Sequence, residues 1–203
     1  MKKTKILLVA LLLISIFSGF LVEARTVEHT VIKGESMWII AQKYMVGLSE
    51  IIGANPQVKN PDLIYPNQIL YIPLNDPGTR SFEQQVIDLT NQKRLANGLP
   101  ALQEDWQLSR CARYKSQDMH DKRYFSHTSP TYGSPFEMMN KFNIYYRSAG
   151  ENIAMGQKTP QQVVDAWWNS PGHRQNMLNA SFTYIGVGYV ADGNYWTQMF
   201  IGK

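Results

Sequence analysis

A short polar stretch at residues 75–79 constrains the fold more than any other feature of the sequence. It reads Asn-Asp-Pro-Gly-Thr and contains the two residue types that most often end helices and strands. The segment before it predicts strands at both of its ends, whereas the segment after it predicts helices first and strands last. A chain of 203 residues is long enough for two small domains. We therefore predict two modules, 26–73 and 81–203, joined by a linker at 74–80.

The first 24 residues have the pattern of an export signal. Three lysines precede an apolar stretch from Ile6 to Phe17, and Val22-Glu23-Ala24 places small or compact residues where a signal peptidase reads. A retained membrane anchor is the alternative, because the apolar stretch extended to Val22 approaches the length that spans a bilayer. We predict a signal peptide at 1–24, and no stable membrane insertion after its cleavage.

Charge and cysteine usage narrow the class of protein. The formal net charge is +4, but three of the lysines lie in the leader, and no concentrated basic stripe follows. Such a stripe is typical of proteins that bind nucleic acid, so we expect no nucleic acid partner. The one cysteine, Cys111, cannot form an internal disulfide and lies among packing residues of a predicted helix. An exported protein without disulfides is typical of a bacterial source.

The segment 26–73 predicts a strand, two helices and a second strand. Alternation of apolar and polar residues places the strands at 28–33 and 69–72, and helical spacing places the helices at 36–44 and 48–54. Two strands that flank two helices form a small α+β module with an antiparallel pair.

Three runs in this segment resemble a LysM module over its whole length, namely 31–41 (VIKGESMWIIA), 54–57 (ANPQ) and 63–73 (LIYPNQILYIP). That family binds glycans containing N-acetylglucosamine, peptidoglycan and chitin, in a shallow groove between the loop before the first helix and the loop before the second strand. The resemblance implies that the groove is lined by Gly34, Glu35, Ser36, Met37, Ile64, Tyr65, Pro66, Asn67 and Gln68. Asn67 stands where the family usually has glycine, but asparagine tolerates left-handed backbone well. The alternative is that Ser36 is only a helix N-cap and Tyr65 only a core residue.

The segment 81–203 predicts four helices followed by a hairpin. The helices span 81–97, where Ser81 and Gln84 form a capping box, and about 105–122, and two more begin at Ser134 and Thr159. Strands at 184–190 and 195–201 surround the turn Asp192-Gly193-Asn194. With a further strand around Glu151, this order predicts a three-layer arrangement and not a parallel βαβ array.

Six runs in this segment resemble the CAP superfamily, also called the SCP family, which includes cysteine-rich secretory proteins, antigen 5 and plant pathogenesis-related proteins. They are 124–127, 134–137, 150–154, 170–174, 184–189 and 195–200. The resemblance is closest to the bacterial, disulfide-free branch and implies an α-β-α sandwich with a central antiparallel sheet, so the whole chain is of the α+β class. It also implies a cleft that holds His127, Glu137, Glu151 and His173. Some members bind zinc or another divalent ion through the two histidines, and no single activity holds for the family.

These four side chains permit metal binding or acid-base chemistry. Two imidazoles can hold zinc, but a catalytic zinc usually has three protein ligands, and no His-Glu-x-x-His run of a common metalloprotease is present. A buried glutamate can instead act as general acid on a glycosidic oxygen, with the second glutamate or a histidine as base. Glu137 follows Ser134 by three residues, so a capping box is the alternative to a place in the cleft.

The two resemblances together predict an exported, wall-associated protein. It binds peptidoglycan or another N-acetylglucosamine glycan through LysM and presents the CAP domain at the cell wall or the spore surface, in spore or cell-wall assembly. One alternative is a hydrolase or lyase that cleaves the glycan strands of peptidoglycan with the CAP-domain glutamates. Another is a secreted effector or protease-like factor. The sequence does not separate binder from enzyme, because all four cleft residues are expected in both.

Overall fold

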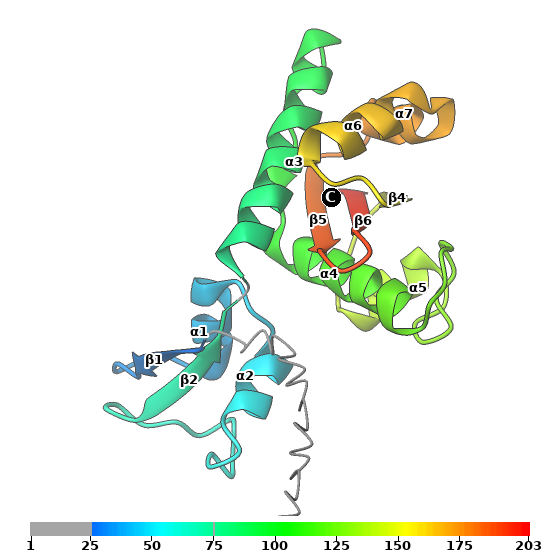
Figure 1. Ribbon diagram of the computed structural model, residues 1–203. Helices are drawn as coiled ribbons and strands as arrows, with labels where there is room; N and C mark the ends of the chain where they lie inside the picture. Colours follow the sequence, from blue (N-terminus) through cyan, green and yellow to red (C-terminus); the bar gives the residue numbers. More distant parts are fainter. Residues whose placement is uncertain (1–25, 75) are drawn as a thin grey trace, which may run out of the picture.

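The computed structural model describes residues 26–74 and 76–203 and contains two modules, with helix α3 leading from the first to the second (Figure 1). The predicted leader, residues 1–24, lies outside the described residues. Within the described ranges, no helix combines the length and the apolar character needed to cross a membrane.

The N-terminal module has the predicted order of strand, helix, helix and strand. β1 (Thr26–Thr30) pairs antiparallel with β2 (Ile69–Pro73), and the core joins this pair to α1 (Met37–Tyr44) and α2 (Leu48–Ala54). Ser36 caps α1, since its side chain accepts a hydrogen bond from the Ile39 amide at 3.3 Å. β1 ends three residues before the predicted limit, and Val31 instead exchanges backbone hydrogen bonds with Asn67 and Gln68.

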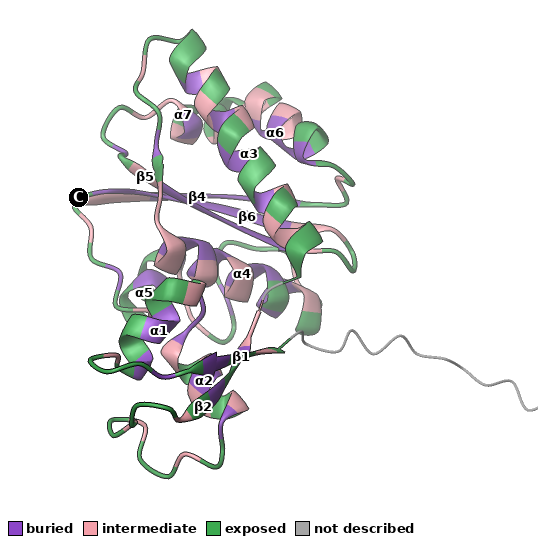
Figure 2. Cartoon of the chain, turned by 90° about the vertical axis from the view of Figure 1, so that its left-hand side faces the viewer, coloured by how far each residue is buried: buried purple, intermediate pink, exposed green. Residues whose placement is uncertain are grey.

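The C-terminal module is an α-β-α sandwich, which confirms the predicted architecture. Its sheet has the order β3 (Gln103–Glu104), β5 (Tyr184–Val190), β6 (Tyr195–Gly202) and β4 (Ser148–Met155), and every pair except the short β3–β5 contact is antiparallel. Helices α3 (Pro77–Ala96), α6 (Pro160–Asn169) and α7 (Pro171–Met177) cover one face, and α4 (Trp106–Asp121) and α5 (Pro135–Lys141) cover the other (Figure 2).

The sheet separates two hydrophobic cores. The core under α3 and α6 contains Val86, Trp167 and Trp196, and the core under α4 and α5 contains Leu108 and Met199. Two glycines of β5, Gly186 and Gly188, permit the close approach of α4, because a Cβ at either position would collide with the helix backbone. Cys111 lies in the α4 core as a fully buried small side chain, and burial raises its pKa far above the ordinary thiol range.

Helix caps explain most of the element boundaries and one error. Asp105, Ser134 and Thr159 accept the expected N-terminal amide hydrogen bonds of α4, α5 and α6. The predicted start of the first long helix at Ser81 is wrong, because α3 begins at Pro77 behind Asp76, whose carboxylate accepts from the Thr79 amide at 2.9 Å. A proline is well suited to the first helical position, so the break at 75–79 lies partly inside the first turn.

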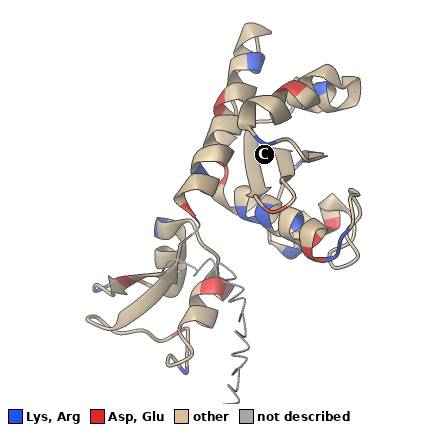
Figure 3. Ribbon diagram, in the orientation of Figure 1, with Lys and Arg blue, Asp and Glu red and all other residues tan. Residues whose placement is uncertain are grey.

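Acidic and basic residues are interspersed over both modules in the view of Figure 3. The modules are also joined by an ion pair, in which Nε of Arg110 on α4 lies 2.8 Å from Oε1 of Glu50 on α2.

Candidate functional site

Two of the predicted cleft residues form a direct pair. His127 lies in the loop after α4 and Glu151 lies in the middle of β4, and His127 Nδ1 is 2.7 Å from Glu151 Oε1. The Glu151 side chain is only 2 % exposed, whereas that of His127 is 51 % exposed. The hydrogen bond therefore connects a buried carboxyl group to a solvent-accessible imidazole.

The surroundings of Glu151 favour its protonated form. Burial raises the pKa of this carboxyl group, and the His127 hydrogen bond and the nearby Lys115 ammonium oppose that shift. Its second oxygen, Oε2, is buried and has no hydrogen-bond partner among the described residues. A carboxyl group with a raised pKa and an unpartnered oxygen can hold and donate a proton.

Lys115, which the sequence did not single out, fixes the loop that carries His127. It is fully buried on α4, and its Nζ donates to Tyr124 Oη at 3.0 Å, to the Ser126 carbonyl at 2.7 Å and to the His127 carbonyl at 2.9 Å. Burial lowers the pKa of Lys115, and the charges of Glu151 and Asp118 counteract this. Lys115 stands at a helical position in a polar stretch, where the sequence does not distinguish a buried lysine from a solvent-exposed lysine.

His173, the third residue of α7, lies near His127, the exposed member of this pair. Its pKa is lowered by burial and further by the charge of the neighbouring His127. Asn152 on β4 donates to the His173 carbonyl at 3.1 Å, and Asn176 on α7 donates to the Glu151 carbonyl at 3.2 Å. These two asparagines hold α7 against β4, and the structure thereby brings three of the four predicted residues together.

Glu137 has different contacts. Its Oε2 accepts hydrogen bonds from the Ser134 amide at 2.7 Å and from the Ser134 hydroxyl at 2.8 Å, and these bonds lower its pKa. This is the capping box of α5 that the sequence offered as the alternative. None of the hydrogen bonds of Glu137 in the described ranges reaches His127, Glu151 or His173. A cleft role for Glu137 stays a prediction.

The donor set for a metal ion is small. In the described part of the chain, no group of three or more His, Cys, Asp and Glu side chains could hold a metal ion. Metal binding by His127 and His173 stays a prediction, and two protein ligands fit a weakly held ion completed by water but not a closed structural site. The lowered pKa of His173 keeps that ring neutral near pH 7, as ligation requires.

The N-terminal module carries a second candidate site. A cavity of about 540 Å³ is bounded on one side by the turn Tyr65 to Gln68 and on the other by residues 57–60 and Leu63. Tyr65 is 59 % exposed, so the alternative that it is only a core residue is wrong. Asn67 has φ +70°, which confirms that asparagine retains the left-handed turn. The side-chain oxygen of Gln68 accepts from the Tyr65 amide at 3.0 Å and closes this turn.

The other predicted glycan-binding loop does not line this cavity. Gly34 has φ +94°, Glu35 accepts from the Ile32 amide at 3.0 Å, and the Met37 side chain is 2 % exposed in the core of the module. Residues 57–60 face the Tyr65 turn instead. Gln57 ends one of the runs that resemble LysM, but residues 58–60 lie outside all three runs and form part of the loop between α2 and β2.

Comparison with protein families assigns both modules. Residues 87–201 match the cysteine-rich secretory protein family (CAP), and residues 29–73 match the LysM domain. The α-β-α sandwich is thus of the CAP type, and it follows a LysM module in the chain. The chain belongs to the cysteine-rich secretory protein (CAP) family, and its single cysteine fits the disulfide-free bacterial branch.

Several bacterial proteins are similar to parts of this chain. The YkwD protein of Bacillus subtilis (strain 168) is 63% identical over 123 residues, which cover 61% of this chain and 48% of YkwD. SpoIVD-associated factor A of the same organism is 47% identical over 45 residues, which cover 22% of this chain and 12% of that protein. The crystal structure of an extracellular protein containing a SCP domain from Bacillus anthracis str. Ames has a TM-score of 0.60 and 38% identity, and the match covers 68% of this chain and 47% of that one. The chain therefore spans less than half the length of each of these relatives.

Proposed function

We propose that this protein is exported and binds peptidoglycan, or another glycan containing N-acetylglucosamine, through its LysM module. The observation that carries this proposal is the cavity beside the exposed ring of Tyr65. The apolar face of a sugar packs against an aromatic ring, and the amide side chains of Gln57, Asn60 and Gln68 offer hydrogen bonds to its acetamido group. A protein held in this way presents its CAP cleft at the cell wall or the spore surface, where it would take part in wall or spore assembly.

The substitution Tyr65→Ala tests the binding proposal. We expect binding of the chain without its leader to soluble N-acetylglucosamine oligomers to weaken about five- to thirtyfold, from the loss of roughly 1 to 2 kcal/mol of apolar contact. Co-sedimentation with insoluble peptidoglycan should fall in parallel. Tyr71→Ala is the matched control, because Tyr71 is an exposed tyrosine of the same module outside the cavity. If Tyr65→Ala binds the oligomers as tightly as Tyr71→Ala does, the proposal is refuted. Binding that weakens steeply as the salt concentration rises would indicate nonspecific electrostatic attraction instead.

A second candidate function is cleavage of the glycan strand by the CAP cleft. The specific observation in its favour is the buried Glu151 carboxyl group, with its raised pKa and its unpartnered oxygen beside His127. Glu151 would donate a proton to the glycosidic oxygen, and a histidine would serve as base or stabilise charge. The wild-type chain would be incubated with intact peptidoglycan at about pH 4 to 8, a range that spans the glutamate and histidine titrations, with and without zinc. The absence of soluble muropeptides by mass spectrometry would remove this candidate for this substrate.

A further inference from the structure

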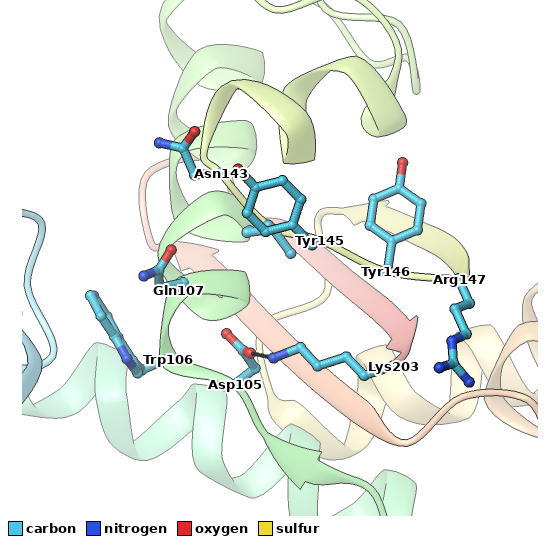
Figure 4. Close-up of a pocket in the computed structure, with 9 residues that line it drawn as sticks. Asp105, Trp106, Gln107, Asn143, Tyr145, Tyr146, Arg147 and Lys203 are labelled. Atoms are coloured by element: carbon cyan, nitrogen blue, oxygen red, sulfur yellow. Dashed lines mark hydrogen bonds and ion pairs between the residues drawn. The ribbon is translucent and has the colours of Figure 1, made fainter.

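A groove that neither candidate site includes runs along the CAP module and reaches the LysM module at one end. Its larger part has a volume of about 550 Å³ and is lined by the start of α4, the segment between α5 and β4, and Lys203 (Figure 4). A second part of about 320 Å³ shares Trp106, Gln107 and Asn143 with the first and extends to Trp38 and residues 47–49 of the LysM module. The two cavities adjoin at these shared residues, and we call them together the intermodule groove. Its dimensions are those of a ligand site, and such sites form preferentially where domains meet.

Specific contacts hold the two walls of the intermodule groove together. Glu50 Oε1 accepts hydrogen bonds from Arg110 Nε and from Tyr114 Oη, both at 2.8 Å, and Arg110 also donates to Ser49 Oγ at 3.0 Å. The rings of Trp38 and Trp106 lie 5.8 Å apart across the module boundary. The groove is therefore preformed, and a ligand would not have to assemble it.

Aromatic rings line the intermodule groove and offer flat apolar faces of the kind that pack against sugar rings. Tyr145 is 79 % exposed and Trp38 is 42 % exposed, and Figure 4 shows Tyr145 and Tyr146 on one side of the larger cavity with Trp106 beside it. Exposed aromatic clusters of this kind commonly mark binding surfaces. Trp38 also follows directly after Met37, the last residue of the predicted glycan-binding loop.

The charges in the intermodule groove favour an anionic ligand. Four of its lining side chains are cationic and one, Asp105, is acidic; the cations are Arg110, Lys141, Arg147 and Lys203. Asp105 is paired with Lys203 at 2.8 Å and Arg110 with Glu50, whereas Arg147 makes no ion pair with any described residue. A guanidinium group binds a carboxylate with two parallel hydrogen bonds, so Arg147 provides an unoccupied carboxylate-binding group at the rim.

We propose that the intermodule groove binds a glycan that carries carboxylates, as the peptide-substituted strands of peptidoglycan do. Sugar rings would pack on Trp38, Trp106 and Tyr145, and a carboxylate would pair with Arg147. This inference deepens the proposed function, on which it rests, because the LysM cavity would hold the uncharged part of the same strand. It predicts that the full protein distinguishes peptide-bearing glycan from neutral oligomers of N-acetylglucosamine.

Calorimetry with two soluble probes of equal glycan length tests this inference. One probe is a neutral N-acetylglucosamine oligomer, and the other is a peptidoglycan fragment with its peptides attached. We expect the two-module chain to bind the peptide-bearing fragment about tenfold more tightly. Arg147→Gln should abolish this difference and leave the affinity for the neutral oligomer unchanged. Arg123→Gln, an exposed arginine beyond the opposite end of α4, is the matched control and should keep the difference.

The outcomes separate this inference from the proposed function. Equal affinity for both probes in the wild type, a difference that survives Arg147→Gln, or a loss that is as large in Arg123→Gln would overturn the groove as a carboxylate-glycan site. In each of these cases, binding of the neutral oligomer would leave the LysM proposal standing. Failure to bind the neutral oligomer, combined with an Arg147-dependent affinity for the peptide-bearing fragment, would support the groove and refute glycan binding by LysM.

Discussion

Replacement of Lys115 by methionine should destabilise the loop that presents His127. Methionine retains most of the length and apolar volume of lysine but has no hydrogen-bond donor. The carbonyl groups of Ser126 and His127, which accept from Lys115 Nζ at 2.7 and 2.9 Å, would therefore lose their partner in a partly buried place. The same change removes a positive charge that lowers the pKa of Glu151, so that pKa should rise further.

The size of the effect follows from the groups left without a partner. A buried carbonyl without a hydrogen bond costs about 1 to 3 kcal/mol, and because these two hydrogen bonds are partly buried, their loss together costs about 2 to 4 kcal/mol. Part of this cost is offset, because the variant no longer buries an ammonium group, whose desolvation lowers the pKa of Lys115 in the native protein. We expect a net loss of about 2 kcal/mol in the free energy of unfolding, a sizeable fraction of the roughly 5 to 15 kcal/mol typical of a folded protein.

Urea unfolding at pH 7 measures this loss. Lys122→Met is the matched control, because Lys122 is an exposed lysine at the C-cap of the same helix, and a surface change of this kind stays within about 0.5 kcal/mol. A loss below about 1 kcal/mol for Lys115→Met, or one equal to that of Lys122→Met, would show that the lysine does not hold the loop.

The histidines give two further predictions. In an NMR titration, His173 should titrate at lower pH than His120. Burial and the charge of His127 lower the pKa of His173, whereas hydrogen bonds to Asp121 and Asp192 raise the pKa of His120. The opposite order of the two titrations would contradict the described surroundings of His173. The folded state resists protonation of His173, so the contribution of neutral His173 to the free energy of unfolding should be present above about pH 6.5. This contribution should be lost as the pH falls below that value. Calorimetry should detect weak zinc binding near pH 7 that disappears below about pH 6, and equal affinity in the double variant His127→Ala, His173→Ala would show that the histidines are not ligands.

Local signals in the sequence predicted the elements that depend on local chemistry. Ser36, Asp105 and Ser134 cap helices where the sequence placed them, and Gly193 and Asn194 adopt the positive φ values that the predicted hairpin turn requires. Where two local signals competed, the prediction failed. Ser81 with Gln84 resembled a helix start, but Asp76 followed by Pro77 is a stronger signal for a helix start. Asp76 caps the helix with its side chain, and the ring of Pro77 fixes φ near the helical value.

Contacts between distant segments were not predictable from one sequence. Lys115 and Asn176 support the cleft through backbone carbonyl groups, and a carbonyl carries no residue-specific signal. The contact between Glu50 and Arg110 joins residues of different modules, and neither lies in a recognisable motif. The cleft histidines could be found because motifs surround them, whereas the groups that orient those histidines could not.

The positions of the two glutamates limit the chemistry available to the cleft. Glycoside hydrolysis commonly uses two carboxyl groups about 5 to 9.5 Å apart. Glu151 is hydrogen-bonded to a cleft histidine, but Glu137 is held by Ser134, and its lowered pKa keeps it ionised. An enzyme built on this cleft would therefore pair Glu151 with a histidine. If the wild type releases soluble glycan fragments, Glu151→Gln should reduce the rate about a hundredfold or more, and Glu137→Gln should retain most of it. Equal loss in the two variants, with both still folded, would instead give Glu137 a place in the reaction.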